Sequence, residues 1–258
     1  MKRKVILISI DGMRPDGFLN CGNPFVETLR KIGSYALDAK TVFPSVTLPC
    51  HYSLFHSIPP SLHGIMTNTY VPPVRPVNGL FEQILAAGGV SAMLYGWEPL
   101  RDVYSPLSCK YTEYVSAKIE DAVDTYLTDR AIWRIERDKP DLVFLYMVDT
   151  DQMGGHKYGW MSEEYLAVIS NAIDNVKKVY ERFGDEYTII ITTDHGGHER
   201  RHGEDIPEDM TIPMFFIGEE FEAGRVLEGM SILDIAPTVA DVMGIPKPDE
   251  WEGRSLVK

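Results

Sequence analysis

The chain has 258 residues, of which 44% are hydrophobic and 24% are charged, a composition typical of a globular protein with a sizeable core. Lys and Arg number 25 against 38 Asp and Glu, so the formal net charge is −13. This charge argues against a nucleic acid polymer or an anionic membrane as partner. It permits a small phosphorylated substrate, because bound metal cations can invert the local field.

The cellular compartment is suggested by three features of the chain. Its three cysteines, Cys21, Cys50 and Cys109, are scattered and odd in number, which favours a reducing compartment over a disulfide framework. The first apolar run begins at Val5, too close to Met1 for a secretory signal. No apolar run approaches the ~20 residues of a membrane span. We therefore expect a cytoplasmic protein without a membrane partner.

Strand-length apolar runs alternate with longer helical patterns. The expected strands lack polar alternation, as strands buried on both faces do, and are Val5–Ile10, Ser91–Leu94, Leu142–Val148, Thr188–Thr193 and Met214–Ile217. The expected helices are Pro24–Ile32, Leu48–Ser57, Leu80–Ala87, Ser116–Arg137, Glu163–Phe183 and Ile232–Met243, the last with Ser231 as N-cap and Gly244 as stop. The alternation predicts an α/β sandwich around a mostly parallel sheet, and residues 1–258 show no linker, so we expect one domain.

Polar residues follow three of these strands. Asp11 ends the first, Asp149 and Asp151 follow the middle one, and Asp194 and His195 follow the late one. In open α/β sheets the loops at the carboxyl ends of the strands gather the chemistry. We expect these side chains to lie on one rim of the sheet.

Histidines concentrate near the same strand ends. His195, His198 and His202 fall within eight residues, and His156 follows Asp151. Imidazole and carboxylate together suit Zn²⁺ and, less exclusively, Mn²⁺ or Fe²⁺. These residues offer more ligands than one tetrahedral ion can bind, and they would suffice for two metals bridged by a substrate oxygen. Taken singly, each residue would more often cap a loop or lie on the surface, but the joint pattern favours a metal site.

Six motifs in a fixed order carry a family resemblance. They are Val5–Asp16 (VILISIDGMRPD), Phe43–Tyr52 (FPSVTLPCHY), His63–Ile65, Gly155–Gly159, Asp194–Gly196 and His202–Gly203. The pattern resembles the alkaline phosphatase superfamily, most of all its type I phosphodiesterase and nucleotide pyrophosphatase branch. The resemblance implies a three-layer α/β/α sandwich. Only six residues separate His195 from His202, where that branch usually has a long insertion, so we expect little or no cap.

The resemblance also implies two divalent metal ions, with zinc favoured, and a threonine nucleophile. One ion would be held by Asp11, Thr47, Asp194 and His195, and the other by Asp151, His156 and His202. A threonine hydroxyl is a weak nucleophile, and coordination to a divalent cation favours its ionised form. Thr47 also precedes an apolar helical stretch, and a helix N-terminus favours an anion.

Two ligand positions have alternatives. Four residues separate Asp151 from His156, where the family usually has three, so Asp149 competes with Asp151. A flexible Gly-Gly pair can absorb one extra residue, which favours Asp151. His198 competes with His202, although the segment after His202 matches the family better.

Cys50 stands about where the family often has asparagine, and a thiol is a weaker donor to phosphate than an amide.

These features favour a metal-dependent phosphodiesterase that forms a threonyl-phosphate intermediate on a small phosphoester. The alternatives are a phosphomonoesterase or phosphonate hydrolase on the same core and, less favoured, a non-catalytic metal-binding domain. A sulfatase is disfavoured because threonine cannot become formylglycine. We expect a preference for diesters, since few fixed cations lie near the motifs. These are Arg14, Lys157, Arg200 and Arg201, and the first two are expected to point away from the metals.

Overall fold

A computed structural model describes residues 3–117 and 122–257. Within these residues the centre is one seven-stranded sheet in the order β2-β7-β6-β1-β5-β3-β4. The strands β6, β1, β5, β3 and β4 are neighbours in this order, and the four pairs that they form are parallel. Strand β7 runs antiparallel to both of its neighbours, β6 and β2. The strands are β1 (Lys4–Ile10), β2 (Ser34–Lys40), β3 (Ser91–Tyr95), β4 (Tyr111–Tyr114), β5 (Leu142–Met147), β6 (Tyr187–Thr192) and β7 (Thr211–Ile217).

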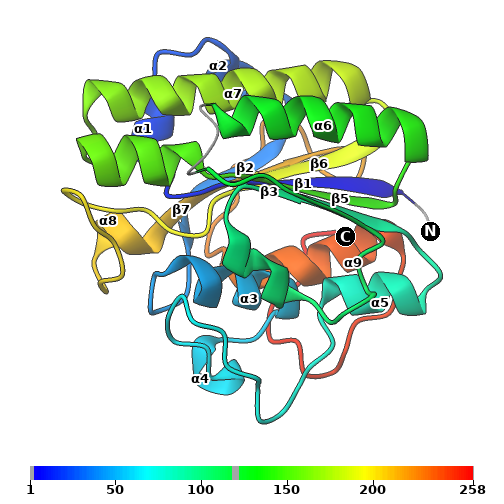
Figure 1. Ribbon diagram of the computed structural model, residues 1–258. Helices are drawn as coiled ribbons and strands as arrows, with labels where there is room; N and C mark the ends of the chain where they lie inside the picture. Colours follow the sequence, from blue (N-terminus) through cyan, green and yellow to red (C-terminus); the bar gives the residue numbers. More distant parts are fainter. Residues whose placement is uncertain (1–2, 118–121, 258) are drawn as a thin grey trace.

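Helices cover both faces of this sheet (Figure 1). One face carries α1 (Pro15–Asn20), α2 (Phe25–Ile32), α6 (Val123–Asp138) and α7 (Glu163–Phe183). The other carries α3 (Thr47–His56), α5 (Leu80–Ala86) and α9 (Ile235–Met243), with the short α4 (Pro60–His63) beyond them. Shorter elements are α8 (Pro207–Met210), a π-helical turn η2 (Thr150–Tyr158) and the 3₁₀ turns η1 (Glu98–Val103) and η3 (Ile232–Asp234). The expected three-layer α/β/α architecture is confirmed.

The central strands are apolar on both sides because helices cover both faces of the sheet. Every residue of β5 and β6 is buried, and so is β1 after Lys4. The five predicted strands are all present. The patterns missed β2, whose burial alternates towards its end, and the four-residue edge strand β4.

One helix begins later than predicted. The pattern placed a helix over Ser116–Arg137, whereas α6 begins at Val123, and positions 118–121 of that prediction lie outside the described residues. The prediction of the last helix is closer. Ser231 Oγ accepts a hydrogen bond from the Leu233 amide, and Gly244 ends α9 with a φ of 68°.

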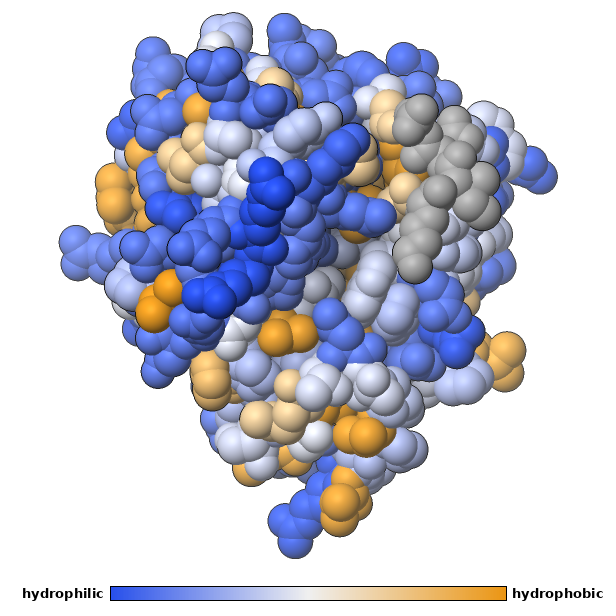
Figure 2. Space-filling model, turned by 60° about the vertical axis from the view of Figure 1, so that its left-hand side comes forward, coloured by the Kyte–Doolittle hydropathy of each residue, from blue (hydrophilic) through white to orange (hydrophobic). Residues whose placement is uncertain are grey.

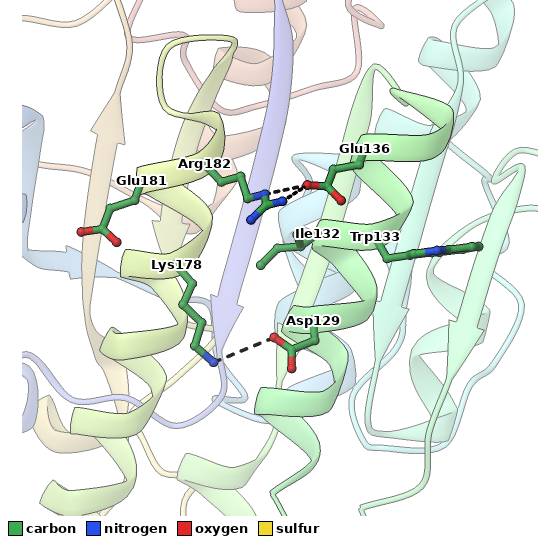
Figure 3. Close-up of a pocket in the computed structure, with 7 residues that line it drawn as sticks. All are labelled: Asp129, Ile132, Trp133, Glu136, Lys178, Glu181 and Arg182. Carbon is green, nitrogen blue, oxygen red and sulfur yellow. Dashed lines mark hydrogen bonds and ion pairs between the residues drawn. The ribbon is translucent and has the colours of Figure 1, made fainter.

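Helices α6 and α7 lie side by side and are joined by ion pairs (Figure 3). Arg182 Nε donates to Glu136 Oε1 at 2.6 Å, and Lys178 Nζ lies 3.9 Å from Asp129 Oδ1. These residues and Trp133 line a groove on the outer side of the helical layer. Among the described helices none is both long and apolar enough to cross a membrane.

Candidate active site

Three buried carboxylates meet where parallel strands end. The register of β1 pairs Ile10 with Met147 of β5 and Ser9 with Thr192 of β6, so the three strands end at one edge. Asp11 follows β1 and Asp194 follows β6, while Asp151 lies in η2 after β5. Their exposed fractions are 2%, 0% and 8%. The predicted rim therefore exists, and its carboxylates face inward rather than towards bulk water.

Two sets of potential ligand atoms form around these carboxylates. Asp11, Asp194 and His195 make one set, Asp151, His195 and His202 the other, and each set offers ligand atoms within 4.8 Å of one another. His195 Nε2 lies 3.4 Å from Asp11 Oδ1 and 3.3 Å from Asp194 Oδ2. His156 Nε2 is 3.4 Å from Asp151 Oδ2. The fold thus brings together the six carboxylate and histidine residues that the sequence pointed to.

The three imidazoles share one hydrogen-bond arrangement. Each directs Nδ1 at a backbone carbonyl, which can only accept, so Nδ1 carries the proton and Nε2 keeps a free lone pair. The acceptors are Gly196 for His195 (2.7 Å), Arg200 for His156 (2.9 Å) and Ser45 for His202 (2.9 Å). A histidine that ligates a metal is usually held in this way, by a hydrogen bond from its other nitrogen.

The carboxylates also have oxygens that the protein leaves unpaired. Asp11 Oδ1, Asp151 Oδ1 and Asp194 Oδ2 are buried and accept no hydrogen bond from any described residue. Burial, together with the charges of Asp194 and Asp151, raises the pKa of Asp11 well above its usual range. An uncompensated buried carboxylate is costly unless it is paired or coordinates a metal. These residues therefore fit divalent cations.

Thr47 lies at the centre of this arrangement. It is the first residue of α3, and its side chain is 4% exposed. Its Oγ1 lies 3.3 Å from His195 Nε2, the nitrogen that also faces Asp11 and Asp194. The hydroxyl therefore lies beside the set of ligand atoms formed by Asp11, Asp194 and His195.

Three residues around the site were not assigned to it from the sequence. The Tyr146 hydroxyl of β5 donates to Asp11 Oδ2, and His51 of α3 places Nδ1 3.4 Å from Asp194 Oδ2. Asn68 Oδ1 accepts from the Leu48 amide at 3.0 Å, next to Thr47, which leaves the Asn68 amide nitrogen available as a donor. Asn68 follows the His63–Ile65 motif by three residues, and that proximity was the only signal in the sequence.

The two alternative ligands have other partners. The Asp149 carboxylate accepts from the Asp124 amide at 3.3 Å, on the side of α6. His198 Nδ1 lies 2.8 Å from Asp209 Oδ1, and its Nε2 accepts from Arg201 Nε at 3.0 Å. Both nitrogens of His198 are thus engaged, whereas the Nε2 atoms of His156 and His202 face Asp151.

The hypothesis that Cys50 replaces an amide contact to phosphate is wrong. The Cys50 side chain is fully buried against the Thr41 hydroxyl and the carbonyl oxygens of Val42 and Pro44. Residue 50 lies three positions after Thr47 on a helix whose residues are all buried, and its thiol points into the core. An asparagine there would bury its amide among these same groups.

A layered α/β fold with buried carboxylates and histidines on one rim is the arrangement of a metalloenzyme-like site. The family model described as type I phosphodiesterase / nucleotide pyrophosphatase matches residues 5–207. The chain belongs to that family, whose members are enzymes that act on phosphoric ester bonds.

Solved structures share the fold at low sequence identity. Murine ectonucleotide pyrophosphatase / phosphodiesterase 5 has a TM-score of 0.80 and 16% identity, covering 99% of this chain and 100% of that one. The phosphonate monoester hydrolase of Silicibacter pomeroyi has a TM-score of 0.74 and 14% identity, covering 98% of this chain and 76% of that one.

Among sequence relatives, the 2,3-bisphosphoglycerate-independent phosphoglycerate mutase of Clostridium botulinum (strain Langeland) is 31% identical over 137 residues. That match covers 51% of this chain and 26% of the mutase, so the chain matches about a quarter of the length of this relative.

Proposed function

We propose that this protein is a metal-dependent phosphodiesterase that attacks its substrate with the Thr47 hydroxyl. The observation that carries the proposal is the position of Thr47 Oγ1. It lies 3.3 Å from His195 Nε2, between buried carboxylates whose unpaired oxygens call for cations. Val46 occupies the N-cap position of α3, so capping the helix does not explain why a threonine lies beside these carboxylates.

The residues would hold two divalent ions as the motif chain predicts. Asp11, Thr47, Asp194 and His195 would bind one, and Asp151, His156 and His202 the other, with zinc favoured by the mixed nitrogen and oxygen donors. When bound, these ions supply positive charge that favours the ionised hydroxyl and offsets the charge of the transferred phosphate. The side chains of the protein provide the nucleophile and orient the phosphate and the ligands.

Attack forms a bond between Thr47 Oγ1 and phosphorus, the hydroxyl proton leaves to solvent, and the leaving oxygen departs with the electron pair of the broken bond. Water then hydrolyses the threonyl phosphate and restores Thr47. The Asn68 amide nitrogen, oriented by the bond to the Leu48 amide, would donate to a phosphate oxygen. The Tyr146 hydroxyl holds Asp11 in position from behind, and His51 Nδ1, which pairs with the Thr47 carbonyl at 2.9 Å, lies 3.4 Å from Asp194 Oδ2.

The proposed substrate is a small phosphodiester. Two divalent charges set against the three carboxylates and an ionised Thr47 leave the site near neutral, which suits a singly charged diester. The net charge of −13 disfavours nucleic acid polymers and anionic membranes as partners. All three cysteines are free thiols, and we propose a reducing, cytoplasmic setting.

Kinetics on matched 4-nitrophenyl substrates test this function. With added zinc or manganese, kcat/KM should be higher for the diester than for the monoester, the phosphonate or the sulfate. A higher value for the monoester or phosphonate would refute the diester preference and favour one of the alternative hydrolases. Metal binding without turnover of any of them would indicate a non-catalytic metal-binding protein.

A further inference from the structure

A pocket of about 560 Å³ opens beside the candidate active site, between the end of η2 and the loop that precedes α8. Trp160 belongs to both places. Its ring lines the pocket, and its centroid lies 5.3 Å from the His156 ring and 6.0 Å from the His202 ring. Its Nε1 donates to the Gly12 carbonyl at 2.9 Å, which fixes the ring. The pocket is therefore separated from two proposed metal ligands by one rigid side chain.

Arg200 also lines this pocket. Its carbonyl accepts from His156 Nδ1, and its side chain passes over Gly159, where a Cβ would lie 3.8 Å from Arg200 Cγ and 3.0 Å from the Glu199 carbonyl oxygen. Gly159 has a φ of 109°, so the close approach and the backbone both favour glycine. Figure 2 shows a group of strongly hydrophilic residues near the middle of the face that it draws.

The two neighbouring arginines differ in what they contact. The Arg201 guanidinium donates to His198 Nε2 at 3.0 Å and lies 3.4 Å from Glu204. The guanidinium of Arg200 has no ion pair or hydrogen bond with any described residue, although the chain carries an excess of acidic residues. An exposed guanidinium without a partner, at the mouth of a pocket with the aromatic walls Tyr158 and Trp160, suits an anionic group attached to an organic molecule.

The direction of the reaction indicates which part of the substrate meets this pocket. From Thr47, the rings of His195, His202 and His156 follow one another, with centroid distances of 3.8 Å and then 5.2 Å. In phosphoryl transfer the attacking and leaving oxygens are roughly in line. We place the leaving group on the side of His156, because the second set of proposed metal ligands and the pocket both lie next to that histidine and its neighbour Trp160.

We infer that Arg200 is a specificity-determining residue that binds a second anionic group on the leaving part of the substrate. The class of substrate is then a phosphoanhydride, or a diester whose leaving alcohol carries a further phosphate or carboxylate. This inference rests on the proposed function for the direction of the leaving group. Arg200 takes no part in forming or breaking bonds.

Binding tests the inference without turnover. The probes are thymidine 5′-monophosphate, which has no leaving part, and its α,β-methylene diphosphate analogue, which has one that cannot leave. In the zinc-loaded protein, Arg200→Gln should lower the affinity for the diphosphate analogue about 10-fold, the usual scale for a charge-assisted hydrogen bond. The affinity for the monophosphate should be unchanged. Arg201→Gln is the matched control, with the same charge change in the same loop, and should leave the ratio of the two affinities unchanged.

Kinetics give a second measurement on one transferred group. Arg200→Gln should lower kcat/KM for thymidine 5′-triphosphate about 10-fold, and leave the 4-nitrophenyl ester of thymidine 5′-phosphate unchanged. The inference would be overturned if Arg200→Gln lowered the affinity for both probes equally, or lowered kcat/KM for both substrates equally. It would also be overturned if Arg201→Gln had the same effect as Arg200→Gln. A wild type that binds both analogues but hydrolyses neither substrate would refute the proposed function, while the affinity ratio would still decide the role of Arg200.

Discussion

Removing one hydroxyl group behind the site tests how the protein holds its carboxylates. Tyr146 is fully buried in β5, and its hydroxyl donates to Asp11 Oδ2. In Tyr146→Phe this oxygen loses its donor, while Asp11 Oδ1 is already unpaired by the protein. The change removes a single atom and leaves the aromatic packing in place.

The size of the effect follows from the charge of the acceptor. A hydrogen bond to a charged group contributes about 1.5–3 kcal/mol to stability, against about 1 kcal/mol for a neutral pair. For a chain of this length, a loss of about 2 kcal/mol corresponds to a fall in Tm of about 4–8 °C. Because Tyr146 orients a proposed ligand, the affinity for the metal should also fall by roughly 10–100-fold.

Urea unfolding of the zinc-loaded protein, together with a competitive zinc titration, measures both quantities. Tyr187→Phe is the matched control, since Tyr187 is also buried but donates to the neutral Pro140 carbonyl at 2.9 Å, at the far end of the sheet. It should lose about 1 kcal/mol of stability with no change in zinc affinity. If Tyr146→Phe matched this control in both measurements, the argument that Tyr146 positions Asp11 would be refuted.

Four further outcomes are expected. Chelation should abolish activity and lower Tm, since a metal at 100 times its Kd stabilises by about 2.7 kcal/mol; an unchanged Tm, or a stoichiometry that saturates at one metal per chain, would contradict the paired sites. Thr47→Ala should lose turnover by about 1,000-fold or more at an unchanged Tm, with Thr47→Ser retaining a measurable fraction; near wild-type turnover of the alanine variant would favour direct attack by water. Asp151→Asn should weaken metal binding by more than the ~100-fold typical of an outer partner, whereas Asp149→Asn should not, and the reverse order would exchange their roles. Burial lowers the pKa of His63 to about 4, so below pH 6.5 the unfolded chain binds more protons and stability falls towards pH 4; His63→Gln should flatten this slope in urea unfolding, and an unchanged slope would assign it to other groups.

The sequence by itself determined the layered fold and the position of most of the site. Runs of buried residues with few polar members mark β1, β5 and β6 without any knowledge of their neighbours, since a strand covered on both faces has no polar alternation. Parallel pairing then places the residues after these strands on one rim. The spacing of the motifs around Thr47 and His195 indicated a reactive site at that rim.

Only the tertiary structure decided which side chains face the site and which point into the core. Tyr146 lies in an apolar run, and nothing local distinguishes it from a core tyrosine; its carboxylate partner is 135 positions away in the chain. Cys50 lies inside the motif that contains Thr47, but the packing of α3 buries its thiol against Thr41.

The same limit applies to the arginine pair. Arg200 and Arg201 cannot be distinguished in the sequence. In the structure Arg201 forms a β-bridge with His198, and its guanidinium donates to the His198 ring, whereas the guanidinium of Arg200 has no such partner among the described residues. Local patterns encode burial and element type, because these depend on neighbours along the chain. The orientation of a side chain depends on contacts between distant segments, and these form only when the sheet and its helices pack together.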